Sequence, residues 1–199
     1  MPRAPLLEPR KQALQARSAQ TVQNIVEAAA RILEQRGFDA YTTNAIAERA
    51  GISIGSLYQY FPNKDAVTVA LMRRETEQLA ADIAAASQIE DWREALSRMV
   101  HVAVVQQLRR PRLAKLLDSE EGRLARQRGE LRSVDRLAAQ IVKVLERGEI
   151  EHGGPARDLA FDLIAITRGM TDMAGERGEA DAPALMRRVG RAVLRYIGV

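Results

Sequence analysis

The sequence predicts an all-α protein, and two observations lead to this fold class. Apolar residues recur at spacings of three and four along most of the 199 residues, which is the period of an amphipathic helix. The alternation of apolar and polar residues that is typical of strands does not occur, and neither do internal repeats or low-complexity tracts. Glycine and proline divide the chain into helices of ordinary length.

The composition excludes several kinds of site. The chain has no cysteine, so it contains neither a disulfide nor a thiolate nucleophile, and its two histidines, His101 and His152, are too few for a Cys/His zinc site. The first twenty residues lack the apolar core of a signal peptide, and nowhere are there eighteen consecutive apolar residues. We expect a soluble cytoplasmic protein without metal or cofactor.

The positive charge lies in the first third of the chain. The formal net charge is +4, and residues 1–74 hold 10 Lys and Arg against 6 Asp and Glu, whereas the remaining residues are balanced. A polyanion is therefore the expected partner of the N-terminal part.

The N-terminal segment 1–17 combines prolines with basic residues and predicts a flexible basic arm. From Ser18 apolar residues recur at helical spacing until Gly37, so residues 18–36 predict an amphipathic helix with a glycine at its C-terminal end.

Two short helices follow. Thr42 or Thr43 can cap "NAIAERA", which Gly51 ends, and Ser53 can cap "IGSLYQY", which Pro62 closes. Two short helices joined by a tight turn that contains glycine form a helix-turn-helix. Asn63 begins the next helix.

The rest of the chain also predicts helices, and the fold class is an N-terminal helix-turn-helix domain followed by a larger helical domain. We expect the domains to be the arm at 1–17, a DNA-binding domain at 18–66 and an effector-binding and dimerisation domain at 67–199. The expected helices cover 64–86, 91–109, 112–118, 122–147, 155–175 and 182–197.

The second helix of a helix-turn-helix enters the major groove of DNA, and this role explains the composition of residues 53–64. Gly55 and Ser56 keep the leading face narrow, Ile54 suits a thymine methyl group, and the Gln59 amide fits adenine. Tyr58 and Tyr60 can reach phosphates with their hydroxyl groups, and Lys64 adds a positive charge. Thr43 can offer a hydroxyl and a backbone N–H to a further phosphate. Leu57 and Phe61 are expected to face the core.

The segment "TVQNIVEAAARILEQRGFDAYTTNAIAERAGISIGSLYQYFPNKDAV" closely resembles the DNA-binding domain of the TetR family of bacterial transcriptional regulators, over about residues 18–68. The resemblance implies a homodimeric repressor, less often an activator, that binds a double-stranded DNA operator and is released by an unidentified small-molecule effector. It also implies which positions touch DNA, and Asn44, Ile54 and Gln59 occupy places that vary and would select the operator. The candidate DNA-binding residues are Thr43, Asn44, Ser53, Ile54, Gly55, Ser56, Tyr58, Gln59, Tyr60 and Lys64.

The family resemblance further implies a homodimer through helices at about 155–175 and 182–197. Apolar stripes on these two segments agree with an interface, although such stripes can equally pack within one subunit. The stripes consist of Leu159, Leu163, Ile166 and Met170, and of Leu185, Val189, Val193 and Ile197. An effector pocket between the helices of 91–175 has Trp92, Met99, Val102, Val105, Leu117 and Leu137 as possible lining, none of them assigned as a ligand residue.

Three other features are assigned structural roles. His101 lies in an apolar run and is expected to be a packed histidine. The segment "DSEEGR" at 118–123 is expected to form a solvated turn between helices, and "GEIEHGGP" at 148–155 is expected to be a connection. No nucleophile with a base, metal set or phosphate loop is present, so an enzyme is not expected. The alternative to an effector-controlled repressor is a non-specific or architectural DNA-binding dimer without an effector.

Overall fold

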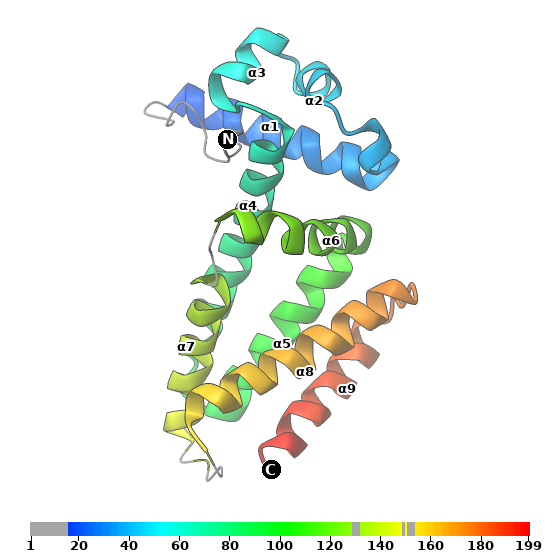
Figure 1. The fold of residues 1–199 in the computed structure, drawn as a ribbon. Helices are drawn as coiled ribbons and strands as arrows, with labels where there is room; N and C mark the ends of the chain where they lie inside the picture. Colours follow the sequence, from blue (N-terminus) through cyan, green and yellow to red (C-terminus); the bar gives the residue numbers. More distant parts are fainter. Residues whose placement is uncertain (1–15, 129–131, 149, 151–153) are drawn as a thin grey trace. The chain divides into compact units, whose positions relative to one another are not determined.

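The computed structural model describes residues 16–128, 132–148, 150 and 154–199, and within these ranges the chain forms helices and no strand (Figure 1). This confirms the all-α prediction. The elements in chain order are α1 (Ala16–Arg36), the 3₁₀ turn η1 (Phe38–Ala40), α2 (Thr43–Arg49), α3 (Ile54–Tyr60), α4 (Lys64–Ala86), α5 (Trp92–Arg109), α6 (Pro111–Arg128), α7 (Arg132–Arg147), α8 (Ala156–Glu176) and α9 (Ala182–Tyr196).

The helices divide into two compact units. The first unit takes α1–α3, the start of α4 up to Glu75, and α6; the second takes the rest of α4 together with α5 and α7–α9. The chain therefore leaves the first unit at Glu75 and returns to it at Arg112. The compact units are defined by packing, whereas the domains 18–66 and 67–199 were predicted from function. The functional domains therefore remain a prediction.

The first unit has its own hydrophobic core, built from the inner faces of its helices. Ile25, Ala29 and Leu33 of α1 pack in one cluster with Leu57 of α3 and with Phe61 after it. Two glycines with positive φ, Gly37 at +70° and Gly51 at +68°, end α1 and follow α2, as expected for the left-handed residue after a helix.

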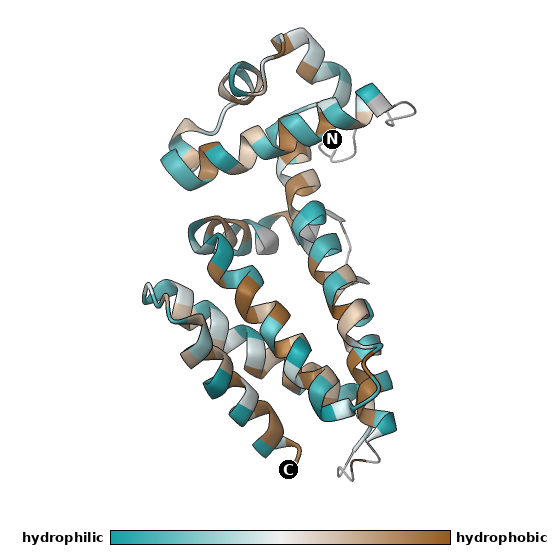
Figure 2. Ribbon diagram, turned by 180° about the vertical axis from the view of Figure 1, so that it is seen from behind, coloured by the Kyte–Doolittle hydropathy of each residue, from teal (hydrophilic) through white to brown (hydrophobic). Residues whose placement is uncertain are grey.

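The second unit has a separate core, and it contains the stripes that were expected at the dimer interface. In this core α5, α8 and α9 pack against one another, and it contains Leu159 and Leu163 of α8. It also contains Leu185, Val189 and Val193 of α9, which are at most 2% exposed within a single chain. Figure 2 shows hydrophilic and hydrophobic residues side by side along single helices, as this one-sided burial requires. The buried residues of both stripes thus pack inside one subunit, and they are not evidence for a dimer.

Helix α6 corrects the prediction for residues 112–147. The expected break within "DSEEGR" does not occur, because α6 continues through residues 118–123 to Arg128. Leu113, Leu117 and Leu124 are buried on one side of this helix, and a face that packs along its length outweighs the low helix propensity of Gly122. Leu117 lies in the core of the first unit, whereas the other residues suggested as pocket lining belong to the second unit.

Among the residues that the structure describes, no helix combines the length and the apolar character needed to cross a membrane.

Candidate nucleic-acid interface

Helix α2 begins at a hydroxyl cap that the sequence left open between two threonines. Thr42 is the cap, since its Oγ1 accepts a hydrogen bond from the backbone N–H of Ala45 at 3.1 Å. Thr43 is therefore not used for capping, and its Oγ1 lies 3.3 Å from the hydroxyl of Tyr58 on α3. This contact joins two candidate residues from different helices of the motif.

Helix α3 begins at Ser53, as predicted. The Ser53 Oγ accepts a hydrogen bond from the Ser56 backbone N–H at 3.1 Å and lies 2.9 Å from the Ser56 Oγ. The two hydroxyl groups thus fix the first turn of α3 while both remain near the surface.

The two faces of α3 differ sharply in exposure. Leu57 and the following Phe61 are fully buried, which confirms that they belong to the core. On the other face Ile54 is 37% and Tyr58 is 42% exposed, unusually high for large apolar or aromatic side chains, and Gln59 is also exposed. Tyr60 is half-buried and packs against the core, so the two tyrosines do not share one environment.

Gly55 has no structural reason to be glycine. It lies inside α3, and a methyl group built on it would meet nothing closer than the Ser53 Oγ at 3.9 Å, which is ordinary contact. Glycine in a helix is less stable than alanine, and here neither close packing nor a positive φ compensates. The open space in front of Gly55 leaves room for a close approach from outside the chain.

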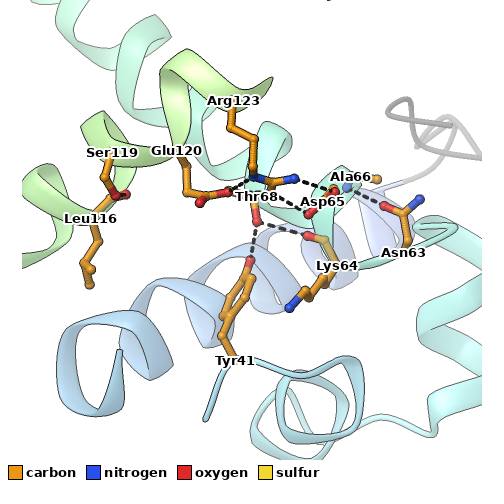
Figure 3. A network of polar contacts seen from close by, with 10 residues as sticks. All are labelled: Tyr41, Asn63, Lys64, Asp65, Ala66, Thr68, Leu116, Ser119, Glu120 and Arg123. Carbon is orange, nitrogen blue, oxygen red and sulfur yellow. Dashed lines mark hydrogen bonds and ion pairs between the residues drawn. The ribbon is translucent and has the colours of Figure 1, made fainter. Parts of the chain in front are cut away.

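The next candidate, Lys64, lies in a first turn of α4 that is held by several polar contacts (Figure 3). Asn63 accepts a hydrogen bond from the Ala66 backbone N–H at 2.8 Å, which caps the helix. The Thr68 Oγ1 lies 3.0 Å from the Lys64 carbonyl oxygen and 3.0 Å from the hydroxyl of buried Tyr41. Burial raises the pKa of Tyr41 well above its usual value, so this phenol stays neutral.

Arg123 of α6 completes this network, and the sequence did not predict its role. Its guanidinium donates to both carboxylate oxygens of Asp65, at 2.9 and 3.1 Å, and to Glu120 at 2.7 Å. The hydrogen bonds to Asp65 and then to Glu120 raise the pKa of Arg123 further above its already high value. Glu120 and Arg123 are three residues apart, a spacing that pairs charges on one helix, but nothing local to the sequence connects them with Asp65.

The remaining predictions concern Asn44, Lys64, the two histidines and the N-terminal arm. Asn44 and Lys64 are exposed on the surface, and His101 is half-buried on α5. The arm at 1–17 lies outside the described residues except for Ala16 and Arg17, which are already helical, and His152 lies outside them too. In the described part of the chain, no group of three or more His, Asp or Glu residues is placed to hold a metal ion.

The sequence of this interface matches a family of known proteins. Residues 25–71 match the family described as "Bacterial regulatory proteins, tetR family". The matched range includes α2, α3 and the first turn of α4, and thus all ten candidate DNA-binding residues.

Individual proteins are also similar to this chain. The HTH-type transcriptional repressor KstR of Mycolicibacterium smegmatis is 39% identical over 57 residues, a match that spans 29% of this chain and 28% of that protein. The nucleoid occlusion factor SlmA of Haemophilus ducreyi is 24% identical over 172 residues, 83% of this chain and 84% of that one. The fatty acid degradation regulator FadR from Bacillus halodurans has the same fold, with a TM-score of 0.76 at 20% identity over 87% of this chain and 94% of its own. The matching family and the relative from Mycolicibacterium smegmatis are named for regulation, in agreement with the prediction that the chain is not an enzyme.

Proposed function

We propose that the chain, a member of the TetR family of bacterial regulatory proteins by the match of residues 25–71, is a DNA-binding transcriptional regulator that inserts α3 into the major groove. The observation that carries the proposal is the division of α3 into a fully buried face and an exposed face of Ile54, Gly55, Tyr58 and Gln59. Packing in the core does not account for an exposed face of this composition. It provides the three kinds of contact that a base-reading helix needs: an apolar group, an amide and a hydroxyl.

Each exposed side chain has a proposed contact. Gln59 pairs its amide with adenine, Ile54 packs on a thymine methyl, and Gly55 lets the helix backbone come close to the base edges. Tyr58 and Lys64 bind phosphates, which fixes the register of α3 without selecting a sequence. The 3.3 Å contact between Thr43 and Tyr58 supports this assignment, because it holds the phenol in place at the surface. The other proposed contacts come from Thr43, Asn44, Ser53, Ser56 and Tyr60.

The regulator is proposed to act as a homodimer on a pseudo-palindromic operator. The relative from Mycolicibacterium smegmatis is named a transcriptional repressor, and we assign repression to this chain as well. Helices at about 155–175 and 182–197 remain the proposed contact between subunits, now through their outer faces, where Met173 and Tyr196 are more than half exposed. Two recognition helices related by a two-fold axis read half-sites one helical turn apart.

A small-molecule effector is proposed to bind the second unit and release the DNA. A hundredfold loss of operator affinity requires only about 2.7 kcal/mol of difference in effector binding between the two states. An operator is chromosomal, so the protein is proposed to act in the cytoplasm.

The test is selection of bound duplexes from a random pool by the full-length protein, followed by competition with unrelated DNA. Enrichment of a pseudo-palindrome that binds far more tightly than the competitor is the expected result. Equal affinity for all duplexes would favour an architectural DNA-binding dimer, and no binding to any duplex would overturn the proposal.

A further inference from the structure

The first turn of α4 is held by a helix from a distant part of the sequence. Arg123 of α6 and Asp65 of α4 are 58 positions apart, and two guanidinium nitrogens donate to the two carboxylate oxygens at 2.9 and 3.1 Å (Figure 3). This parallel, two-point geometry is specific to arginine, since a lysine ammonium cannot reproduce it.

The guanidinium is also fixed from its own helix. Its Nε donates to Glu120 at 2.7 Å, so all three nitrogens are used and the planar group has a single orientation. The backbone of α6 is held as well, since Leu113 and Leu117 are buried in the core of the first unit and Leu124 is buried against Val69 of α4. A rigid group on a rigid helix can determine where its partner lies.

The partner of Arg123 is the neighbour of a proposed DNA contact. Asp65 directly follows Lys64, and Lys64 follows the end of α3 by only four residues. Lys64 is exposed, and among the described residues its side chain makes no hydrogen bond or ion pair, so it is available to a phosphate. The ion pair therefore ties Arg123 to the residue next to Lys64.

We propose that Arg123 is a positioning residue for DNA binding: its bidentate pair with Asp65 sets the position of Lys64 against the phosphate backbone. The inference rests on the proposed function, because it gives Lys64 a phosphate to bind. Arg123 itself makes no contact with DNA in this arrangement.

Substitution of Asp65 separates positioning from simple charge. If only the local charge mattered, Asp65→Asn would remove a negative charge beside the DNA and strengthen binding, whereas Arg123→Gln would weaken it. If the pair positions Lys64, both substitutions weaken binding, and the double variant is no worse than either single variant.

The experiment measures the affinity of the full-length protein for the duplex recovered by selection, over a range of salt concentrations. Arg123→Gln and Asp65→Asn are each expected to weaken binding about tenfold. The slope of log affinity against log salt should fall by about one in both, as in Lys64→Gln, because one phosphate contact is lost. Arg98→Gln is the matched control: it removes the same charge from an exposed side chain of α5 in the second unit, outside both proposed binding surfaces, and it should leave the affinity within about twofold.

Three results would overturn the inference: tighter binding by Asp65→Asn, additive losses in the double variant, or an unchanged salt slope. The proposed function would stand in each case, provided that the wild-type protein binds the selected duplex. Thermal unfolding shows whether each variant folds. Should Arg123→Gln not fold, Arg123→Lys keeps the charge without the two-point geometry, and wild-type affinity in that variant would equally overturn the inference. If the wild-type protein binds no duplex, both the function and this inference fail.

Discussion

Helices α3 and α9 have the same amphipathic design, and yet only one of them can be assigned a partner from its pattern. In α3 the buried Leu57 stands opposite Tyr58 and Gln59; in α9 buried Leu185, Val189 and Val193 stand opposite exposed arginines at 187, 191 and 195. The comparison teaches that amphipathicity tells which face is buried but not what either face contacts. For α3 the answer comes from its place after a tight turn and from side chains that fit base edges.

The comparison depends first on the burial of the inner face of α9, and this burial can be tested by mutation. Leu185 is fully buried in the core of its own chain, so Leu185→Ala should lower the free energy of unfolding by about 2 to 5 kcal/mol, measured in urea. Arg98→Ala, which changes an exposed side chain of α5 in the same unit, is the control and should change it by about 0.5 kcal/mol or less. A small effect of Leu185→Ala would contradict the assignment of this stripe to the core.

The outer faces of α3 and α9 should differ in their effect on the choice of DNA sequence. Gln59→Ala should cost about 1 to 3 kcal/mol of DNA binding and relax the preference at one base position, because the bidentate amide contact with adenine is lost. Arg191→Gln removes an exposed polar side chain from α9 instead and should leave the base preference unchanged. The measurement is competition between the selected duplex and single-position variants of it, and an unaltered preference in Gln59→Ala would show that Gln59 does not read a base.

The same contrast explains how much the sequence alone could predict. The short helices of the first unit carry local signals, Ser53 as a cap and Gly51 as the residue that ends α2, and both predictions were correct. The ion pair between Asp65 and Arg123 has no local signal, since it depends on how α6 packs in the folded chain. The prediction of a turn within α6 was wrong: a run of charged residues usually faces water, but here the buried stripe of Leu113, Leu117 and Leu124 keeps the chain helical.

The buried stripes of α8 and α9 could not be assigned for a different reason. A helical period shows that one face of a helix is buried away from water. A partner subunit and the chain's own core can cover that face equally well. Burial of Leu163 and Val189 in a single chain resolves this choice.

Each unit contains a tyrosine with a raised pKa, Tyr41 in the first and Tyr196 in the second, and their contributions to stability should differ at alkaline pH. Burial is the main cause of the raised pKa of Tyr41, whereas exposed Tyr196 of α9 has a raised pKa because its hydroxyl donates to Asp162 at 2.7 Å. The folded state keeps Tyr41 protonated, so its contribution to stability is fully present below the unfolded pKa of about 10 and is lost as the pH rises further. Tyr41→Phe should therefore cost about 0.5 to 1.5 kcal/mol near neutral pH through the lost hydrogen bond to Thr68.

Above about pH 10 this cost should shrink by about 1.4 kcal/mol per pH unit, because the variant has no phenol to ionise in the unfolded state. Urea unfolding at several pH values measures the difference. Tyr196→Phe is the comparison and should show a smaller dependence on pH, because the Tyr196 phenol is exposed and water weakens the effect of the Asp162 carboxylate. A difference between Tyr41→Phe and the wild type that stays constant with pH would contradict the assignment.

The smallest expected effect tests the outer face of α3 most directly, because stability and binding should change in opposite directions. Gly55→Ala adds a methyl group where nothing lies closer than 3.9 Å, and it should raise the free energy of unfolding by about 0.5 to 1 kcal/mol through helix propensity. The same methyl group points into the space where the helix is proposed to meet the bases, so the affinity for the selected duplex should fall. Thermal unfolding and DNA titration of the one variant give both quantities. A more stable protein that binds as tightly as the wild type would show that the bases do not approach Gly55, and the α3 face would then be no better assigned than the outer face of α9.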